Sequence, residues 1–294
     1  MSQSNALQKP KFSVAIQTDM YRNLINNTLQ DAKRASRFIA SISSAVATNP
    51  ALQECDAGTI LSSALLGEAL NLSPSPQLGQ YYLVPYNDKK RDCKVAQFQL
   101  GAKGYKQLAI RSGQYLDIDC IEIKQGEFMG RDKYNGKQRF EFIEDDAARE
   151  NLPTIGYLAY FELLNGFKKQ IYWTVEKMEN HANTYSQAFN LNTFHKIKNG
   201  EIPQSDMWKY SSFWYKSFAE MAEKTMLRQL ISKWGIMSIE MQDAITKDMA
   251  VIDKDGNTTY VDVDSVDEQE PIEHDKPLQT SENDVPDAVN IDDL

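Results

Sequence analysis

The sequence lacks a long apolar run. No stretch of the 294-residue chain approaches the ~18 consecutive apolar residues that a membrane-spanning helix requires. The polar start, MSQSNALQKPK, also lacks the apolar core of a secretory signal. These absences predict a cytoplasmic protein that makes no membrane contact.

Cysteine and histidine are scarce. The three cysteines are odd in number and have no ligand-like spacing, so free thiols in a reducing compartment explain them best. They are Cys55, Cys93 and Cys120. The three histidines are His181, His195 and His274, and none has a cysteine, histidine or carboxylate at metal-ligand spacing. No nucleophile motif is recognisable either, so we expect no metal, no cofactor and no catalytic residue.

A phosphate-binding loop for ATP is absent as well. The nearest match, GRDKYNGKQ at residues 130–138, has one residue too many between its glycines. It also places Gln138 where a Mg²⁺-binding serine or threonine belongs, and it falls in a predicted hairpin. We therefore expect no ATP-driven activity.

What the chain does have is charge of both signs, in separate segments. Residues 248–294 contain fifteen acidic and two basic residues, whereas residues 1–247 carry a net charge of +4 within a chain whose total is −9. The acidic segment is too polar to fold alone. Such asymmetry indicates that the basic part contacts nucleic acid or a membrane. The acidic part either docks a partner, competes with nucleic acid for the basic part, or only adds solubility.

Hydrophobic periodicity predicts an α+β fold, with antiparallel β-hairpins flanked by helices. Helical patterns cover residues 19–48, 57–72, 101–112 and 175–184, and the longest runs over 205–234. Strand patterns form hairpins from 81–86 with 94–100, around Asn135-Gly136 and around Asn165-Gly166, and residues 116–124 also alternate. Thr174 suits the N-cap of the helix that follows it. We expect a flexible arm at residues 1–18, a folded core at 19–247 and a largely disordered acidic tail at 248–294.

The segment from Gly79 to Tyr115 carries the strongest functional signal. It has six aromatic residues and seven basic residues against two acidic ones, a net charge of +5. Its basic residues are Lys89, Lys90, Arg91, Lys94, Lys103, Lys106 and Arg111. Cations for phosphates and flat rings for bases are the chemistry that binds a single-stranded nucleic acid. Composition alone leaves a solvated basic face over an aromatic core as an equal alternative.

The helical pattern over 205–234 carries a second set of cations. Lys209, Lys216, Lys224 and Arg228 follow one another at spacings of seven, eight and four residues, which keeps them near one stripe of a helix. They fit one wall of a phosphate-binding groove whose other wall would be the segment from Gly79 to Tyr115. On the pattern alone, the solvated side of an amphipathic helix fits slightly better.

A nuclease site is a further alternative. Asp117, Asp119, Glu122 and Lys124 resemble the carboxylate–lysine set that holds Mg²⁺ and assists an attacking water. Strand alternation, however, places the two aspartates on one face and Glu122 with Lys124 on the other. A metal site here would need a bulge, and an ordinary polar strand face is the simpler interpretation.

Three segments resemble the RecT family of phage and prophage single-strand annealing recombinases. They are LNLSPSPQLGQYYLVPYN at residues 70–87, FQLGAKGYKQLAIRSGQY at 98–115 and EKTMLRQLISKWGIMS at 223–238. They stand in the family's order, and the resemblance covers roughly residues 20–247.

The resemblance implies a protein that is not an enzyme. It would bind single-stranded DNA left by a partner 5′→3′ exonuclease and anneal it to a complementary strand without ATP, in the bacterial cytoplasm. It would act as a homo-oligomeric ring or helical filament, with the single strand and the annealed duplex in a positive groove built by the 19–247 core. The C-terminal region would meet the exonuclease and the host single-strand-binding protein.

The DNA-binding residues expected from these arguments are Lys89, Lys94, Gln99, Lys103, Lys106, Arg111, Lys209, Lys216, Lys224 and Arg228. A Mg²⁺-dependent nuclease and a non-catalytic adaptor remain the alternatives.

Overall fold

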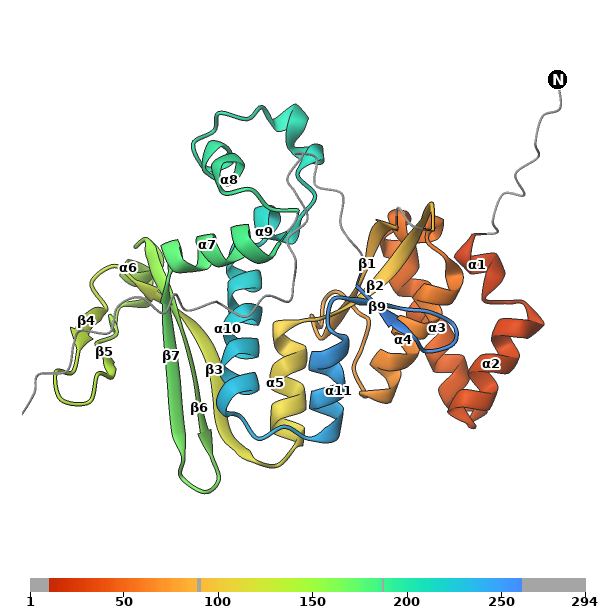
Figure 1. Ribbon diagram of the computed structural model, residues 1–294, viewed down its shortest axis with the longest axis horizontal. Helices are drawn as coiled ribbons and strands as arrows, with labels where there is room; N and C mark the ends of the chain where they lie inside the picture. Colours follow the sequence, from red (N-terminus) through yellow and green to blue (C-terminus); the bar gives the residue numbers. More distant parts are fainter. Residues whose placement is uncertain (1–10, 89–90, 187, 261–294) are drawn as a thin grey trace, which may run out of the picture.

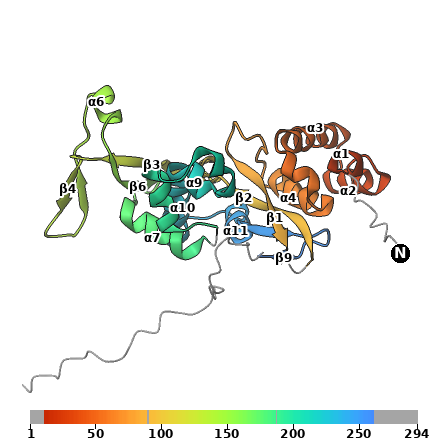
Figure 2. The ribbon, with the colours of Figure 1, turned by 90° about the horizontal axis from the view of Figure 1, so that it is seen from above.

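A computed structural model describes residues 11–88, 91–186 and 188–260 of the chain. It has the α+β class that the sequence predicts, with antiparallel strands flanked by helices. Figures 1 and 2 show an elongated arrangement, with helices α1–α3 at one end and the small hairpin of β4 and β5 at the other. Within the described ranges, no helix is both long enough and apolar enough to cross a membrane.

The N-terminal helices pack into one end of the molecule. They are α1 (Phe12–Ala15), α2 (Asp19–Leu29), α3 (Ala32–Thr48), the 3₁₀ helix η1 (Pro50–Glu54) and α4 (Ala57–Ala69). The pattern over 19–48 is two helices, because Gln30 adopts a left-handed conformation (φ 54°) and Asp31 caps α3. Phe12 and Ile16 are buried, so the packed body includes residues that the sequence pattern assigns to the flexible arm.

The first sheet contains the basic–aromatic hairpin. Its strands are β1 (Tyr81–Asp88), β2 (Cys93–Leu100), β8 (Ala250–Ile252) and β9 (Thr258–Thr259), in the order β1-β2-β8-β9. The predicted hairpin is confirmed, with Tyr81 opposite Leu100. Strand β8 pairs with β2 through Phe98 and Ala250. Residues just beyond 247, assigned to the tail by their composition, therefore belong to the folded body.

The second sheet has the order β3-β6-β7, from β3 (Tyr115–Lys124), β6 (Thr154–Leu163) and β7 (Lys168–Thr174). A small hairpin of β4 (Phe128–Arg131) and β5 (Gln138–Phe140), followed by α6 (Asp146–Glu150), extends from its end. Both predicted Asn-Gly turns are confirmed. Gly136 and Gly166 have φ of 69° and 84°, which glycine adopts without steric cost.

The remaining helices connect the two sheets. They are α5 (Ala102–Arg111), α7 (Val175–Tyr185), α8 (Leu191–Lys198), the 3₁₀ helix η2 (Gln204–Lys209), α9 (Phe213–Lys216), α10 (Phe218–Trp234) and α11 (Ile239–Lys247). Thr174 caps α7 as predicted, its hydroxyl accepting a hydrogen bond from Lys177 N at 3.2 Å.

The long C-terminal helix of the core is present as α10, but the pattern over 205–234 is not one helix. Non-helical backbone at Tyr210 and Ser217 separates η2, α9 and α10. Lys209 and Lys216 therefore do not share a helical stripe with Lys224 and Arg228. The prediction of one continuous stripe is wrong.

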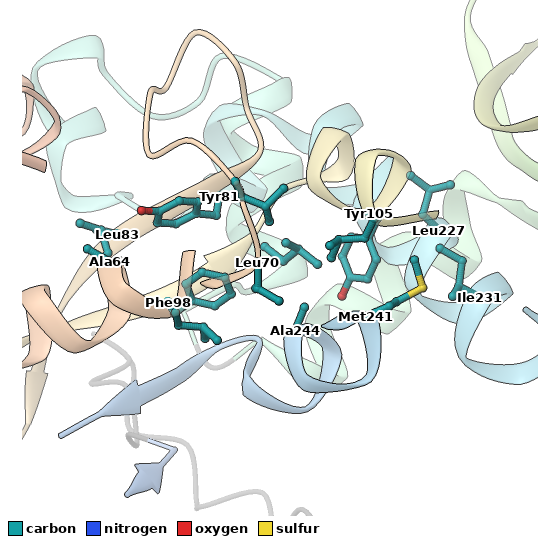
Figure 3. Close-up of a cluster of buried hydrophobic side chains, with 14 of the residues drawn as sticks. Ala64, Leu70, Tyr81, Leu83, Phe98, Tyr105, Leu227, Ile231, Met241 and Ala244 are labelled. Carbon is teal, nitrogen blue, oxygen red and sulfur yellow. The ribbon is translucent and has the colours of Figure 1, made fainter. Parts of the chain in front are cut away.

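One hydrophobic core joins the two halves. Figure 3 shows buried side chains continuing from Leu83 and Phe98, under the first sheet, through Leu70 and Tyr105 to Met241, Leu227 and Ile231. Helix α10 packs on α5 and on all three strands of the second sheet. Figure 1 accordingly places α10 between β7 and α5.

A buried carboxylate lies where these elements meet. Asp248 is 1% exposed. Its Oδ1 accepts hydrogen bonds from Leu100 N at 2.8 Å and Lys224 Nζ at 3.0 Å. Its Oδ2 accepts from the Tyr105 hydroxyl at 3.1 Å and from Arg228 at 3.5 Å. Burial lowers the pKa of the Lys224 ammonium group, and Asp248 opposes that effect. Asp248 thus supplies the counter-charge that allows a lysine to stay inside the core.

We expect Asp248→Asn to lower the free energy of unfolding by about 3–5 kcal/mol, because it leaves the Lys224 ammonium buried without a counter-charge. Urea unfolding followed by circular dichroism measures the change. Asp255→Asn, at an exposed turn position, is the matched control and should stay within about 0.5 kcal/mol of the unsubstituted chain. Equal stabilities of the two variants would contradict this role for Asp248.

Candidate nucleic-acid interface

A pocket of about 220 Å³ lies between the two segments that the sequence singles out for their cations. One wall comes from the turn before β1, the end of β2 and the start of α5; the other comes from α9 and the start of α10. Its lining includes Gly79, Tyr82, Gln99, Lys103, Phe213 and Lys224. We call it the α5–α10 pocket.

Glycines allow two backbone segments in the first wall of the pocket to approach each other closely. A Cβ on Gly101 would lie 2.1 Å from the Gly79 carbonyl oxygen, and one on Gly104 would lie 2.1 Å from the Gln80 carbonyl oxygen. Neither approach tolerates a side chain. Gly101 N donates to the Gln80 carbonyl at 2.8 Å. The turn before β1 therefore packs backbone to backbone against the first turn of α5, and this contact shapes the pocket.

Few of the predicted rings reach the pocket. Tyr81, Phe98, Tyr105 and Tyr115 are buried in the core. Tyr82 lines the pocket, and its ring centroid lies 6.1 Å from that of Phe213 on α9. Phe213 is 40% exposed, so part of its side chain is open to solvent. Sequence reasoning missed Phe213, although the run SSFWYK around it combines rings with Lys216.

Two of the predicted cations are available to a ligand. Lys103 is exposed at the edge of the pocket, and Lys216 is exposed on α9. Within the described part of the chain, neither forms an ion pair. Lys209 is partly neutralised by Asp206, 3.2 Å away on the same turn of η2. Lys89 lies outside the described residues.

Lys106 has internal partners instead. Its Nζ lies 2.5 Å from Asp119 Oδ1 on β3 and 2.6 Å from Glu223 Oε1 on α10. Partial burial opposes the charged form, but these two carboxylates outweigh it and raise the pKa of the Lys106 ammonium group. The residue joins three elements and has no free charge to offer a phosphate. Lys224 and Arg228 are likewise paired, with Asp248.

Three more predicted site residues also bind within the protein. Arg111 donates to the carbonyl oxygens of Leu70 at 2.5 Å and Asn71 at 3.0 Å, at the C-terminal end of α4. Lys94 pairs with Glu54. Gln99, 6% exposed, donates to the Gln97 amide oxygen at 2.7 Å and to the Tyr86 hydroxyl at 3.2 Å, while also lining the pocket. The structure therefore brings Gln99, Lys103 and Lys224 together at one pocket and places Arg111 and Lys94 elsewhere.

The carboxylates considered for a nuclease do not converge. Asp119 pairs with Lys106, whereas Glu122 Oε2 accepts from Lys124 Nζ at 2.6 Å and Thr154 Oγ1 at 2.8 Å. Burial opposes ionisation of Glu122, but these hydrogen bonds lower its pKa overall. Across the described ranges, no group of three histidine, cysteine or acidic residues is arranged to hold a metal ion.

The comparison with protein families decides the identity. The RecT family model matches residues 36–262, most of the chain. The chain belongs to the RecT family. Proteins of this family act in DNA recombination by annealing single strands. The chain is 37% identical over 260 residues to the uncharacterised protein YqaK of Bacillus subtilis, covering 88% of this chain and 78% of YqaK. It is 28% identical over 222 residues to Protein RecT of Escherichia coli, covering 73% of this chain and 71% of that protein.

The contacts of Arg111 with the end of α4 give it a structural role. We expect Arg111→Ala to lower the free energy of unfolding by about 1.5–3 kcal/mol, because two charge-assisted hydrogen bonds to carbonyl oxygens are lost. Urea unfolding measures this, with Lys103→Ala as the control that leaves stability unchanged. If Arg111→Ala kept full stability but bound single-stranded DNA weakly, Arg111 would instead be a DNA contact.

Proposed function

We propose that this RecT-family protein anneals complementary DNA strands without ATP, and that the α5–α10 pocket contacts the first strand. The observation that carries the proposal is the meeting of an unpaired lysine, Lys103, with an exposed ring, Phe213, at one pocket. Lys216 adds a second free cation on the same wall as Phe213. Cations beside stacking surfaces are the features of sequence-independent single-strand binding.

The start of α5 supports a phosphate position beside Lys103. Its N-cap is Gly101, so no side chain caps the first backbone N–H groups of this helix. Uncapped N–H groups and the helix dipole favour an anion at this end. Contacts of this kind hold the backbone of a strand and leave the Watson–Crick edges of its bases free for pairing, as annealing requires.

One subunit offers few free charges to DNA. The pocket also contains Glu220 and Glu223, and Glu223 is neutralised by Lys106. Binding by counterion release grows with the number of phosphates contacted, so several subunits side by side would bind far more tightly than one. We therefore propose that the protein acts as a homo-oligomer, a ring or a filament, with the pockets of neighbouring subunits along one strand.

We expect Lys103→Ala to weaken binding of a labelled single-stranded oligonucleotide without loss of stability. Because one phosphate contact per subunit is removed, the slope of log affinity against log salt should fall by about 0.7 for each subunit bound. Fluorescence anisotropy at several salt concentrations measures this, and annealing of two complementary oligonucleotides without ATP measures function. Lys254→Ala, an exposed lysine in the β8–β9 turn, is the control.

Lys106→Ala provides the contrasting variant, three residues away on the same helix. It should destabilise the fold, because Asp119 and Glu223 lose their shared counter-charge. Unchanged DNA affinity of Lys103→Ala at every salt concentration would contradict the pocket assignment. Degradation of the oligonucleotide in Mg²⁺ would contradict annealing as the sole activity.

The acidic C-terminal residues are proposed to recruit partners, a 5′→3′ exonuclease and the host single-strand-binding protein. The fold indicates where to cut, because β9 (Thr258–Thr259) pairs with β8 and a deletion should spare both strands. We expect removal of residues 261–294 to leave annealing intact and to abolish co-precipitation of the partner exonuclease. Annealing that is lost with the deletion, in a chain that still folds, would contradict this division of roles.

A further inference from the structure

The hairpin of β4 and β5 carries cations that have no part in the function proposed above. Its segment RDKYNGKQR, residues 131–139, has four basic residues and one acidic residue, a net charge of +3. We call this segment the β4–β5 tip. Among the described residues, its cations form no ion pair with a carboxylate, and all four are exposed: Arg131, Lys133, Lys137 and Arg139.

The tip is ordered by its own acidic residue. Asp132 Oδ1 accepts hydrogen bonds from Tyr134 N at 2.9 Å and from Asn135 N at 3.1 Å. The backbone N–H of Asp132 donates to the Lys137 carbonyl oxygen at 2.8 Å. The two hydrogen bonds to the carboxylate, and Arg139 to a lesser extent, lower the pKa of Asp132. The carboxylate is therefore committed to the turn, and the backbone that carries the cations is fixed.

A buried ion pair holds the base of the hairpin. Glu127, immediately before β4, is 0% exposed. Its Oε1 accepts from Arg149 Nε at 2.5 Å, and its Oε2 accepts from Arg149 Nη2 at 3.2 Å. Arg149, on α6, also donates to the Glu122 carbonyl oxygen of β3 at 2.6 Å. A buried carboxylate is costly unless it is paired and hydrogen-bonded in this way. The pair ties both ends of the segment 127–149 to β3, so the hairpin has a defined position on the second sheet.

Rings at the base of the hairpin pack on the second sheet, whereas the ring at the tip does not. Phe128 stacks on Tyr172 of β7 with centroids 5.3 Å apart, and Phe140 meets the same ring edge-on at 5.3 Å. Tyr134, in the turn, is 100% exposed. Figures 1 and 2 show the hairpin extending beyond the rest of the second sheet. The tip adds nothing to the core, and its ring and cations are open to a ligand.

The chemistry of the tip suits the backbone of a nucleic acid. Each free cation can replace a condensed counterion at one phosphate, and an exposed ring offers a face to a base or a sugar. The acidic residues that follow the hairpin would repel DNA, so the contact is confined to the tip. These residues are Glu141, Glu144, Asp145 and Asp146.

The tip is separate from the α5–α10 pocket. Figures 1 and 2 place the second sheet between the hairpin and α5. DNA at the tip is therefore DNA outside the pocket, either the length of a strand that runs beyond it or annealed duplex. In both cases the pairing of bases takes place away from the tip and does not depend on it.

We propose that the β4–β5 tip is a second DNA-binding site, which holds the phosphate backbone of DNA that lies outside the α5–α10 pocket. The proposal rests on the function proposed above, because the ligand is the DNA that the protein anneals. A second contact to the same DNA molecule makes rebinding intramolecular, so it raises the overall affinity without any change at the pocket. The tip thus retains DNA at salt concentrations at which the pocket alone releases it.

The test uses the full-length protein with Lys133→Gln and Lys137→Gln together. Lys33→Gln with Lys254→Gln is the matched control, because it removes the same charge at exposed positions elsewhere. Fluorescence anisotropy at several salt concentrations measures affinity for a labelled single strand and, separately, for a pre-annealed duplex. For each subunit bound, the slope of log affinity against log salt should fall by about 1.4 if the tip holds a single strand, or by about 1.8 if it holds duplex. The control should match the wild type.

Tyr134 gives a second readout that does not depend on charge. Tyr134→Ala should weaken binding of the same form of DNA about fivefold with the salt slope unchanged, because a ring face is lost and no ionic contact is. Tyr134→Phe keeps the ring and should bind as the wild type does. Wild-type affinity of Tyr134→Ala would overturn the role given to the ring.

A lysine variant that matches the control in affinity and salt slope, for both forms of DNA, would overturn the proposal. So would a changed oligomeric state in light scattering without DNA, because the tip would then contact another copy of the chain. A loss with the single strand supports a contact to strand beyond the pocket, and a loss with duplex alone supports a contact to the annealed product. Failure of the wild-type protein to bind single-stranded DNA at all would instead overturn the function proposed above, and Lys103→Ala tests the pocket independently of the tip.

Discussion

The fold depends on a buried charge that is fully compensated. A lysine and an aspartate placed in a core are costly unless each is paired and hydrogen-bonded. Asp248 meets this condition through four donors, which come from β2, α5 and α10. The same contacts fix the start of α5 relative to α10. Because those two helices form the walls of the α5–α10 pocket, the geometry of the pocket follows from the position of one carboxylate.

This arrangement also decides which charges DNA can use. Lys224 lines the pocket, but its charge is directed to Asp248, so it contributes polarity without free positive charge. Of the predicted DNA-binding lysines that the structure describes, Lys103 and Lys216 form no ion pair with a carboxylate and are left to attract phosphates. Some cations therefore stabilise the fold while others face solvent, even within one helix: on α5, Lys106 is paired with carboxylates and Lys103 is not.

Local features were predictable from the sequence. The hairpins at Asn135-Gly136 and Asn165-Gly166 and the Thr174 cap depend on a few adjacent residues, and all three are present. The long helix over 205–234 was predicted wrongly, because apolar spacing continues through Tyr210 and Ser217 while the backbone turns there. Asp248 was counted with the acidic tail, because composition does not distinguish a buried aspartate from a solvated one.

For the candidate site, the sequence predicted which segments contribute cations but not which individual residues are free to bind a ligand. Residues 79–115 and 205–234 both line one pocket, and their role as the walls of a DNA-binding groove stays a prediction. The individual residues were harder, since Lys103 and Lys106 lie three apart on one helix and differ only in what reaches them. Asp119 and Glu223 come to Lys106 from distant parts of the chain. Nothing in the spacing of the lysines reveals that.

The pairing of β8 with β2 has a consequence for how the chain matures. Leu100 N and its acceptor Asp248 are 148 residues apart, and Gln97 and Met249 are 152 apart. A ribosome adds about 5–20 residues per second, so the first half of the chain waits several seconds for the residues that complete its sheet. During that interval β2 has an unpaired edge, and Lys224, once synthesised, lacks its counter-charge until Asp248 follows 24 residues later. Closure of the body is therefore a late event, and a nascent chain that stops short of residue 248 would expose the strand edge to other molecules.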